Sequence, residues 1–100
     1  MYIAMNRFKV TSGREKDFEK IWTERDTHLE EVPGFIEFHL VKGAVEPTHT
    51  VYASHSTWDS ETDFINWTKS DAFRRAHKGA REHTDVYLSH PVFEGFEVIL

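Results

Sequence analysis

A histidine on an otherwise apolar helix face is the residue of this 100-residue chain with the clearest capacity for chemistry. Residues 71–81 (DAFRRAHKGAR) have helical spacing, and one stripe of that helix carries five side chains: Ala72, Phe73, Ala76, His77 and Ala80. Three of the five are alanines, which leaves room for a flat, broad molecule against the helix. A neutral imidazole in such a slot suits iron, and haem iron is commonly held by one proximal histidine. A histidine satisfied within the protein core is the structural alternative.

Basic residues surround this stripe, although the formal net charge of the chain is -5. Between residues 69 and 81 they are Lys69, Arg74, Arg75, Lys78 and Arg81, opposed only by Asp71. Arg74, Arg75 and Lys78 flank Phe73 and Ala76, where they could bind the two propionate groups at the edge of a porphyrin. A solvated helix face has the same composition, so both interpretations stay open.

Asn6 interrupts the apolar side of the first predicted strand, residues 2–10. Strand alternation puts its side chain on the face of Ala4, Phe8 and Val10, which we expect to be buried. A buried amide must find hydrogen-bond partners or cost about 1–3 kcal/mol. Asn6 is therefore either bonded to nearby backbone or a donor directed into a pocket, where it would steady an oxygen species on iron.

Trp67 lies at the end of the short helix that precedes the histidine helix. Packing in the core is the usual role of an indole in such a place. Beside a planar macrocycle, the same side chain would press the ring out of plane. Distortion of the macrocycle is one way in which a protein changes the reactivity of haem.

Other kinds of site find little support. The chain has no cysteine, no HExxH, no P-loop and no dinucleotide-binding glycine fingerprint. The remaining histidines lack metal-ligand spacing; they are His28, His39, His49, His55, His83 and His90. The acidic net charge argues against nucleic-acid binding. With no signal-peptide pattern and no run near the ~20 apolar residues of a membrane helix, we expect a cytoplasmic protein without membrane attachment.

The elements that must position these residues follow the order β-α-β-β-α-β. Strands are expected at residues 2–10, 35–42, 49–58 and 93–100. The first helix is expected to begin at a capping box of Ser12 and Glu15 and to end at Pro33-Gly34. Its apolar stripe comprises Phe18, Ile21, Trp22, Arg25, Leu29 and Val32. The second helical unit is split, since Asp59 or Ser60 can cap the part with Trp67 and Ser70 the part with His77.

This order predicts an α+β, ferredoxin-like fold, in which helices cover one face of a four-stranded antiparallel sheet. The length fits a single domain, residues 1–100. So short a chain, without disulfides, needs a bound ligand or an oligomer for added stability. The uncovered sheet face carries apolar side chains and therefore predicts a homodimer.

Two segments resemble the haem-degrading monooxygenases of the IsdG type, which belong to the dimeric α+β-barrel superfamily that includes the antibiotic-biosynthesis monooxygenases. They are AMNRFKV, residues 4–10, and NWTKSDAFRRAHKGAR, residues 66–81. The second contains the pattern W-x-K-S-x-x-F-x-x-A-H with the family's Trp-to-His spacing. EVPGF, residues 31–35, resembles the family's turn, and HPVFEGFEV, residues 90–98, resembles rhizobial-type bacterial members linked to haem uptake.

The resemblance implies roles for three residues. His77 matches the proximal iron ligand, Trp67 the residue that ruffles the haem, and Asn6 the distal polar group. Haem would then be both cofactor and substrate, with electrons from a reductase or small reductant. Oxygen would open the ring, yielding iron and a bilin-type product. The rhizobial likeness favours a biliverdin-type product, whereas the three residues leave the cleavage position open.

Three alternatives remain at this point. A cofactor-free monooxygenase of aromatic polyketides also uses Asn and Trp in a comparable pocket, although the inward histidine argues against it. A haem carrier would need the same histidine but no turnover. A dimeric stress protein without a ligand would leave Asn6 and His77 as incidental core residues.

Overall fold

The computed structural model describes residues 1–25, 28–76 and 85–100, and this part of the chain forms an α+β fold. Its elements in chain order are β1 (Tyr2–Thr11), α1 (Glu15–Glu24), the 3-10 turn η1 (Leu29–Glu31), β2 (Phe35–Val45), β3 (His49–Trp58), α2 (Glu61–Thr68), α3 (Asp71–Ala76) and β4 (Val92–Glu97). The strands form an antiparallel sheet in the order β2-β3-β1-β4. The predicted ferredoxin-like order and topology are therefore confirmed.

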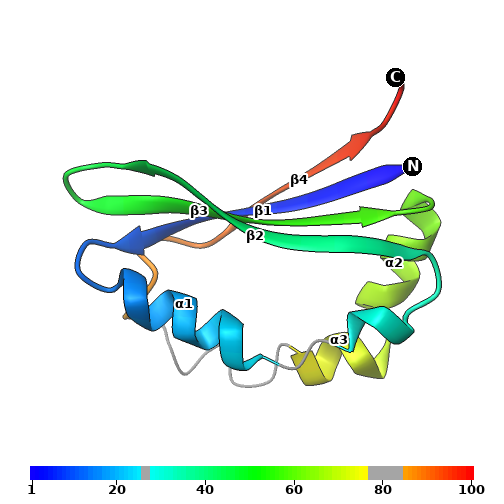
Figure 1. The fold of residues 1–100 in the computed structure, drawn as a ribbon, viewed down its shortest axis with the longest axis horizontal. Coiled ribbons are helices and arrows are strands. Elements are labelled where there is room, and N and C mark those ends of the chain that lie inside the picture. Colours follow the sequence, from blue (N-terminus) through cyan, green and yellow to red (C-terminus); the bar gives the residue numbers. More distant parts are fainter. Residues whose placement is uncertain (26–27, 77–84) are drawn as a thin grey trace.

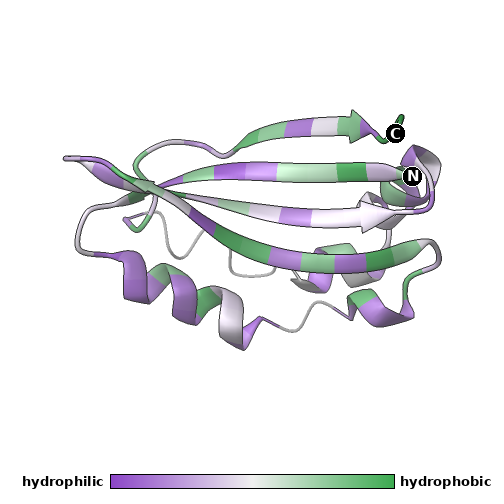
Figure 2. Ribbon diagram, turned by 45° about the horizontal axis from the view of Figure 1, so that its top comes forward, coloured by the Kyte–Doolittle hydropathy of each residue, from purple (hydrophilic) through white to green (hydrophobic). Residues whose placement is uncertain are grey.

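All the described helices lie on one side of the sheet (Figure 1). The strands alternate between hydrophilic and hydrophobic residues, as expected for a sheet with two different faces (Figure 2). Two buried clusters form between sheet and helices. Phe8, Val10 and Phe18 lie in the cluster under α1, whereas Tyr2 and Trp58 lie in the cluster under α2. None of the described helices is long and apolar enough to cross a membrane.

The central strand β1 pairs with β3 on one side and with β4 on the other. Ala4, Phe8 and Val10 are buried, which confirms the predicted inner face. Asn6 lies on that face between the two clusters and is half-buried. Its position in the middle of the strand places the amide near the middle of the sheet.

The start of α1 differs from the predicted capping box. The helix begins at Glu15 and no side chain caps it. The Ser12 hydroxyl donates instead to the Pro47 carbonyl oxygen at 3.3 Å, which links it to the turn between β2 and β3. Glu15 accepts a hydrogen bond from the Gly13 N–H at 2.7 Å, and Gly13 adopts a φ of +90°, which suits glycine.

The first helix is also shorter than predicted. It ends at Glu24, because Arg25 adopts an extended conformation with ψ of 125°. Leu29 belongs to the separate turn η1, which follows His28 at a φ of +51°. Leu29 and Val32 still pack in the cluster under α2, as their apolar character requires. The 3.6-residue spacing therefore predicted correctly that Leu29 and Val32 pack in the core, but predicted wrongly that they belong to the same helix as Phe18.

Strand bounds also differ at two places. β2 continues to Val45 rather than residue 42, because an irregularity between Lys42 and Val45 lets the strand resume pairing at Thr50. β4 runs from Val92 to Glu97 rather than to residue 100. β3 matches its predicted range of 49–58.

The second helical unit is split, as predicted. The Ser60 hydroxyl oxygen accepts a hydrogen bond from the Asp63 N–H at 3.2 Å and caps α2. Ser70 caps α3 in the same way, accepting from the Phe73 N–H at 3.2 Å. The described part of α3 ends at Ala76.

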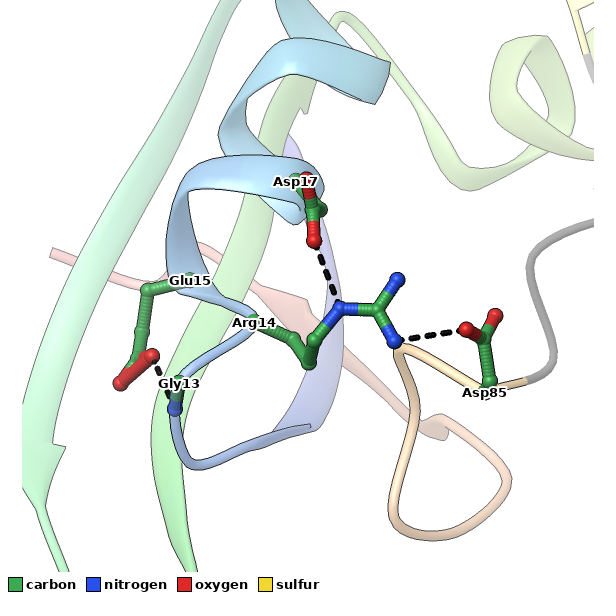
Figure 3. A network of polar contacts seen from close by, with 5 residues as sticks. All are labelled: Gly13, Arg14, Glu15, Asp17 and Asp85. Atoms are coloured by element: carbon green, nitrogen blue, oxygen red, sulfur yellow. Dashed lines mark hydrogen bonds and ion pairs between the residues drawn. The ribbon is translucent and has the colours of Figure 1, made fainter.

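A network of polar contacts fixes the chain that leads into β4. Arg14 donates from Nε to Asp17 and from Nη1 to Asp85, each at 2.6 Å (Figure 3). Hydrogen bonds to both carboxylates raise the pKa of Arg14. Next along the chain, the Val86 carbonyl accepts from the Thr11 N–H at 2.9 Å, and Val86 is buried. The segment that follows residues 77–84 is thereby held against the end of β1.

Candidate functional site

A cavity of about 350 Å³ lies between the sheet and the helices, where the two buried clusters meet. This volume is typical of small-molecule sites, which span roughly 300–1,000 Å³. The described residues that line it are Ala4, Asn6, Trp22, Arg25, Leu29, Phe38, Ser54, Ser56, Phe64, Trp67, Thr68, Phe73 and Phe93. Six of them are aromatic, so the cavity favours a flat apolar ligand.

The sheet forms the floor of the cavity and supplies three of its polar side chains, Asn6, Ser54 and Ser56. Asn6 pairs across the strands with Ser54 on one side and with Phe93 on the other. The Asn6 side chain forms no hydrogen bond with any described residue, and its polar atoms are not sealed from the cavity. Of the two alternatives for Asn6, the bond to nearby backbone is therefore not formed in the described part of the chain. The amide remains available to a ligand.

Trp67 forms the opposite wall and is held by other rings. Its centroid lies 5.3 Å from Trp58, 6.0 Å from Phe64 and 4.8 Å from Phe73. Trp58 is completely buried, so this support is part of the core. An indole packed in this way resists displacement. Such resistance is required of a side chain that bends a ligand.

Ser70 connects Trp67 to Phe73 through the break between α2 and α3. Its hydroxyl donates to the Trp67 carbonyl at 2.6 Å and accepts from the Phe73 N–H at 3.2 Å. The T-shaped contact between the two aromatic rings, at 86°, follows from this link. The cap therefore sets the relative position of two cavity-lining rings.

Arg25 brings a positive charge to the cavity from the end of α1. Its guanidinium carbon lies 4.2 Å from the centroid of the Trp22 ring, which in turn stacks on Phe38. Burial lowers the pKa of Arg25, against an opposing effect of Tyr87. Within the described residues, no carboxylate forms an ion pair with this guanidinium. A half-buried cation of this kind can pair with an anionic group of a ligand.

The structure brings together only part of the predicted site. Asn6, Trp67 and Phe73 line the same cavity. Arg74 and Arg75 are exposed, and Arg74 pairs with Asp71 at 2.5 Å; neither is among the described residues that line the cavity. Ala76 is the last described residue of α3, and the predicted ligands His77 and Lys78 lie outside the described residues.

Metal binding by a cluster of side chains finds no support in the described part of the chain, where no three His, Asp or Glu residues are grouped as metal ligands. A macrocycle that carries its own metal needs only one or two protein ligands. The lining residues fit such a molecule, since they combine aromatic walls, a polar floor and one cation.

Comparison with known proteins identifies the family. The sequence profile described as "Antibiotic biosynthesis monooxygenase" matches residues 1–79. The chain belongs to this family.

Two relatives of known activity have related sequences. The staphylobilin-producing heme oxygenase of Staphylococcus saprophyticus is 35% identical over 81 residues, covering 79% of this chain and 75% of the relative. The heme-degrading monooxygenase of Shouchella clausii is 30% identical, covering 99% and 92%.

The solved structure of a heme-degrading protein also has a similar fold. The heme degrader MhuD of Mycobacterium tuberculosis, determined with two hemes in its active site, has a TM-score of 0.77 and 28% identity and covers 100% of this chain and 97% of its own. A Bacillus cereus family member superposes with a TM-score of 0.75 at 18% identity, over 97% of this chain and 91% of that one, which supports the fold alone.

Several residues that line the cavity of the present chain were not predicted from its sequence. Arg25 belongs to the apolar stripe predicted for the first helix, and a charged residue within such a stripe is the sequence signal that marks it. Ser54 and Phe93 gave no such signal, because their proximity to Asn6 depends on strand register. Phe38 reaches the cavity from β2 by packing on Trp22.

Proposed function

We propose that this family member binds haem in the cavity and opens the haem ring with oxygen. One arrangement carries the proposal: Asn6 lies on the sheet floor, and Trp67 and Phe73 form the helical wall of the same cavity. A flat apolar molecule with carboxylates at its edge suits such a lining. The haem-degrading activity of two relatives supports the same choice.

Binding would use three kinds of contact. His77 is proposed to bind the iron through a neutral imidazole nitrogen. The aromatic walls would cover the porphyrin and exclude water from it. Arg25 is proposed to bind a propionate, since it is the cation that lines the described cavity, with Arg74, Arg75 and Lys78 as the alternative that the sequence suggested.

Turnover would depend on two further side chains. Bound haem supplies the iron at which oxygen is activated, with electrons from an external reductant. Asn6 would direct its amide N–H groups into the cavity and hold the oxygen on one side of the ring. Trp67 would press on the macrocycle, because Trp58, Phe64 and Phe73 prevent it from yielding.

The products are proposed to be free iron and a bilin. The likeness of residues 90–98 to rhizobial-type members favours a biliverdin-type ring-opened product. The described residues of this segment contribute Phe93 to the cavity, stacked on Phe64 at 5.5 Å and 8°.

A homodimer is proposed to complete the fold. Strand register places Val41, Val92 and Phe96 on the sheet face opposite the helices, and they are 43%, 58% and 44% exposed. Apolar side chains on a broad sheet face are typical of an interface between copies.

Replacement of the proposed iron ligand tests the function. His77→Ala should weaken ferric haem binding and abolish turnover with ascorbate in air, because the variant lacks the imidazole. His90→Ala is the matched control, since His90 is exposed and lies outside the cavity lining. Equal Soret spectra and equal turnover in wild type and His77→Ala would refute the assignment.

A further inference from the structure

Ser54 lies next to Asn6 on the floor of the cavity. The two residues are direct cross-strand partners on β3 and β1, and both line the cavity. Side chains in such pairs have Cβ atoms about 4.5–5.5 Å apart, so one small ligand atom can touch both. Ser54 is only 7% exposed.

The hydroxyl of Ser54 differs from every other hydroxyl of its strand. Each of the others has a polar partner: Thr50 with Glu15, Tyr52 with Glu19, Ser56 with Ala4 and Trp58, and Thr57 with Glu37. Ser54 forms no side-chain hydrogen bond with any described residue. Its oxygen is also not fully buried, so the hydroxyl can form a hydrogen bond with a ligand in the cavity.

Ser56 shows that residue type alone does not explain this difference. It lies two residues further along the same strand, points to the same face and also lines the cavity. Its hydroxyl accepts a hydrogen bond from Trp58 Nε1 at 2.9 Å and donates to the Ala4 carbonyl at 3.3 Å. Ser56 therefore holds the core together, whereas Ser54 has no equivalent task.

We propose that Ser54 is a second hydrogen-bond donor beside Asn6, and that the pair positions a small oxygen-bearing or anionic ligand at the cavity floor. The proposal rests on the proposed function, because the ligand is one held on the haem. Because the Ser54 hydroxyl has no partner among the described residues and faces the cavity, it can bond to a ligand without breaking a bond within the described protein.

The hydroxyl would also supply a donor and an acceptor at a single atom. A serine hydroxyl donates one hydrogen bond while the same oxygen accepts another, whereas Asn6 donates from its amide nitrogen and accepts at its amide oxygen. Ser54 can therefore hold a water molecule and a ligand at the same time. Ser54 is a positioning residue in this scheme, and Asn6 remains the principal distal group.

Cyanide bound to the ferric haem complex is the probe that tests the pair, because it is a small anion that accepts hydrogen bonds. Ser54→Ala should leave haem affinity within about twofold and lower cyanide affinity about fivefold, as expected for one lost hydrogen bond. Ser54→Thr, which keeps a hydroxyl, should restore most of the affinity. Ser56→Ala should lower the thermal midpoint and leave cyanide affinity unchanged.

The outcomes separate this proposal from the proposed function. If the wild type binds no haem, the proposed function fails and this inference fails with it. If the wild type binds haem and cyanide, and Ser54→Ala keeps the wild-type cyanide affinity, only the inference is refuted. Should Ser54→Ala not fold, the pair Ser54→Thr and Ser54→Val allows the same comparison, since valine has nearly the shape of threonine without its hydroxyl.

Discussion

Arginine residues near the proposed site differ in what surrounds them. Arg25 is half-buried over the Trp22 ring and lines the cavity, whereas Arg74 and Arg75 are exposed on α3. The sequence indicated Arg74 and Arg75 as propionate ligands, because basic residues that are close together in the sequence can be recognised without a structure. The position of Arg25 depends on where α1 ends. Arg25 itself is extended and follows the last helical residue, and its side chain lines the cavity.

Arg25→Gln should therefore weaken haem binding by about tenfold or more, because a charge-assisted hydrogen bond contributes about 1.5–3 kcal/mol. Haem affinity is measured by Soret titration. The control is Arg75→Gln, which removes an exposed charge outside the described cavity lining. The effect of Arg25→Gln should vanish with haem dimethyl ester, which lacks the carboxylates. A larger loss in Arg75→Gln would favour the basic cluster on α3 instead.

Trp67→Phe should keep haem binding and change the rate of ring opening or the product distribution. The smaller ring presses less on the macrocycle while the contacts with Phe64 and Phe73 retain an aromatic partner. Product spectra and single-turnover rates measure the effect. Wild-type rates and products would remove Trp67 from the mechanism.

At the scale of elements, hydroxyl side chains near helix starts have different roles. Sequence spacing predicted Ser12, Ser70 and either Asp59 or Ser60 as capping residues, and the structure shows Ser60 and Ser70 in that role. Ser12 is bonded to Pro47, 35 residues away in the chain, so local spacing could not reveal its role. The order of the elements, the bounds of β3 and the break between α2 and α3 could be predicted from local sequence patterns. The bulge in β2 and the position of Ser54 beside Asn6 could not, because they depend on how the strands pair.

Ser70→Ala should lower the free energy of unfolding by about 0.5–2 kcal/mol, the usual cost of losing a cap. It should also lower haem affinity, because the cap links Trp67 to Phe73. Ser12→Ala is the matched control and should change stability by less than about 0.5 kcal/mol, since its bond lies at the surface. Urea titration gives both values. Equal losses in the two variants would contradict the capping assignments.

At the scale of the whole molecule, the helices cover one sheet face and leave the other without a layer in the described chain (Figure 1). The cavity lies on the covered face, so association through the opposite face would not occupy the cavity. The proposed dimer therefore adds stability to a short chain without competing with the ligand.

Val41→Glu should convert the proposed dimer into a monomer, because two carboxylates would be buried at the interface. Light scattering coupled to size-exclusion chromatography measures the mass. Val45→Glu is the control: Val45 is 71% exposed and pairs with Thr50, whose side chain points to the helix-covered face. A wild-type mass equal to one chain would refute the dimer.

The central claim is tested most directly by absorbance during hemin titration of the purified protein, followed by ascorbate in air with an iron chelator present. The account predicts a Soret band that saturates near one haem per chain and then decays, with ferrous iron captured and a bilin absorbance appearing. A stable Soret band under several reductants would indicate a carrier and contradict the enzymatic claim. The absence of any Soret complex would contradict haem as the ligand of this cavity.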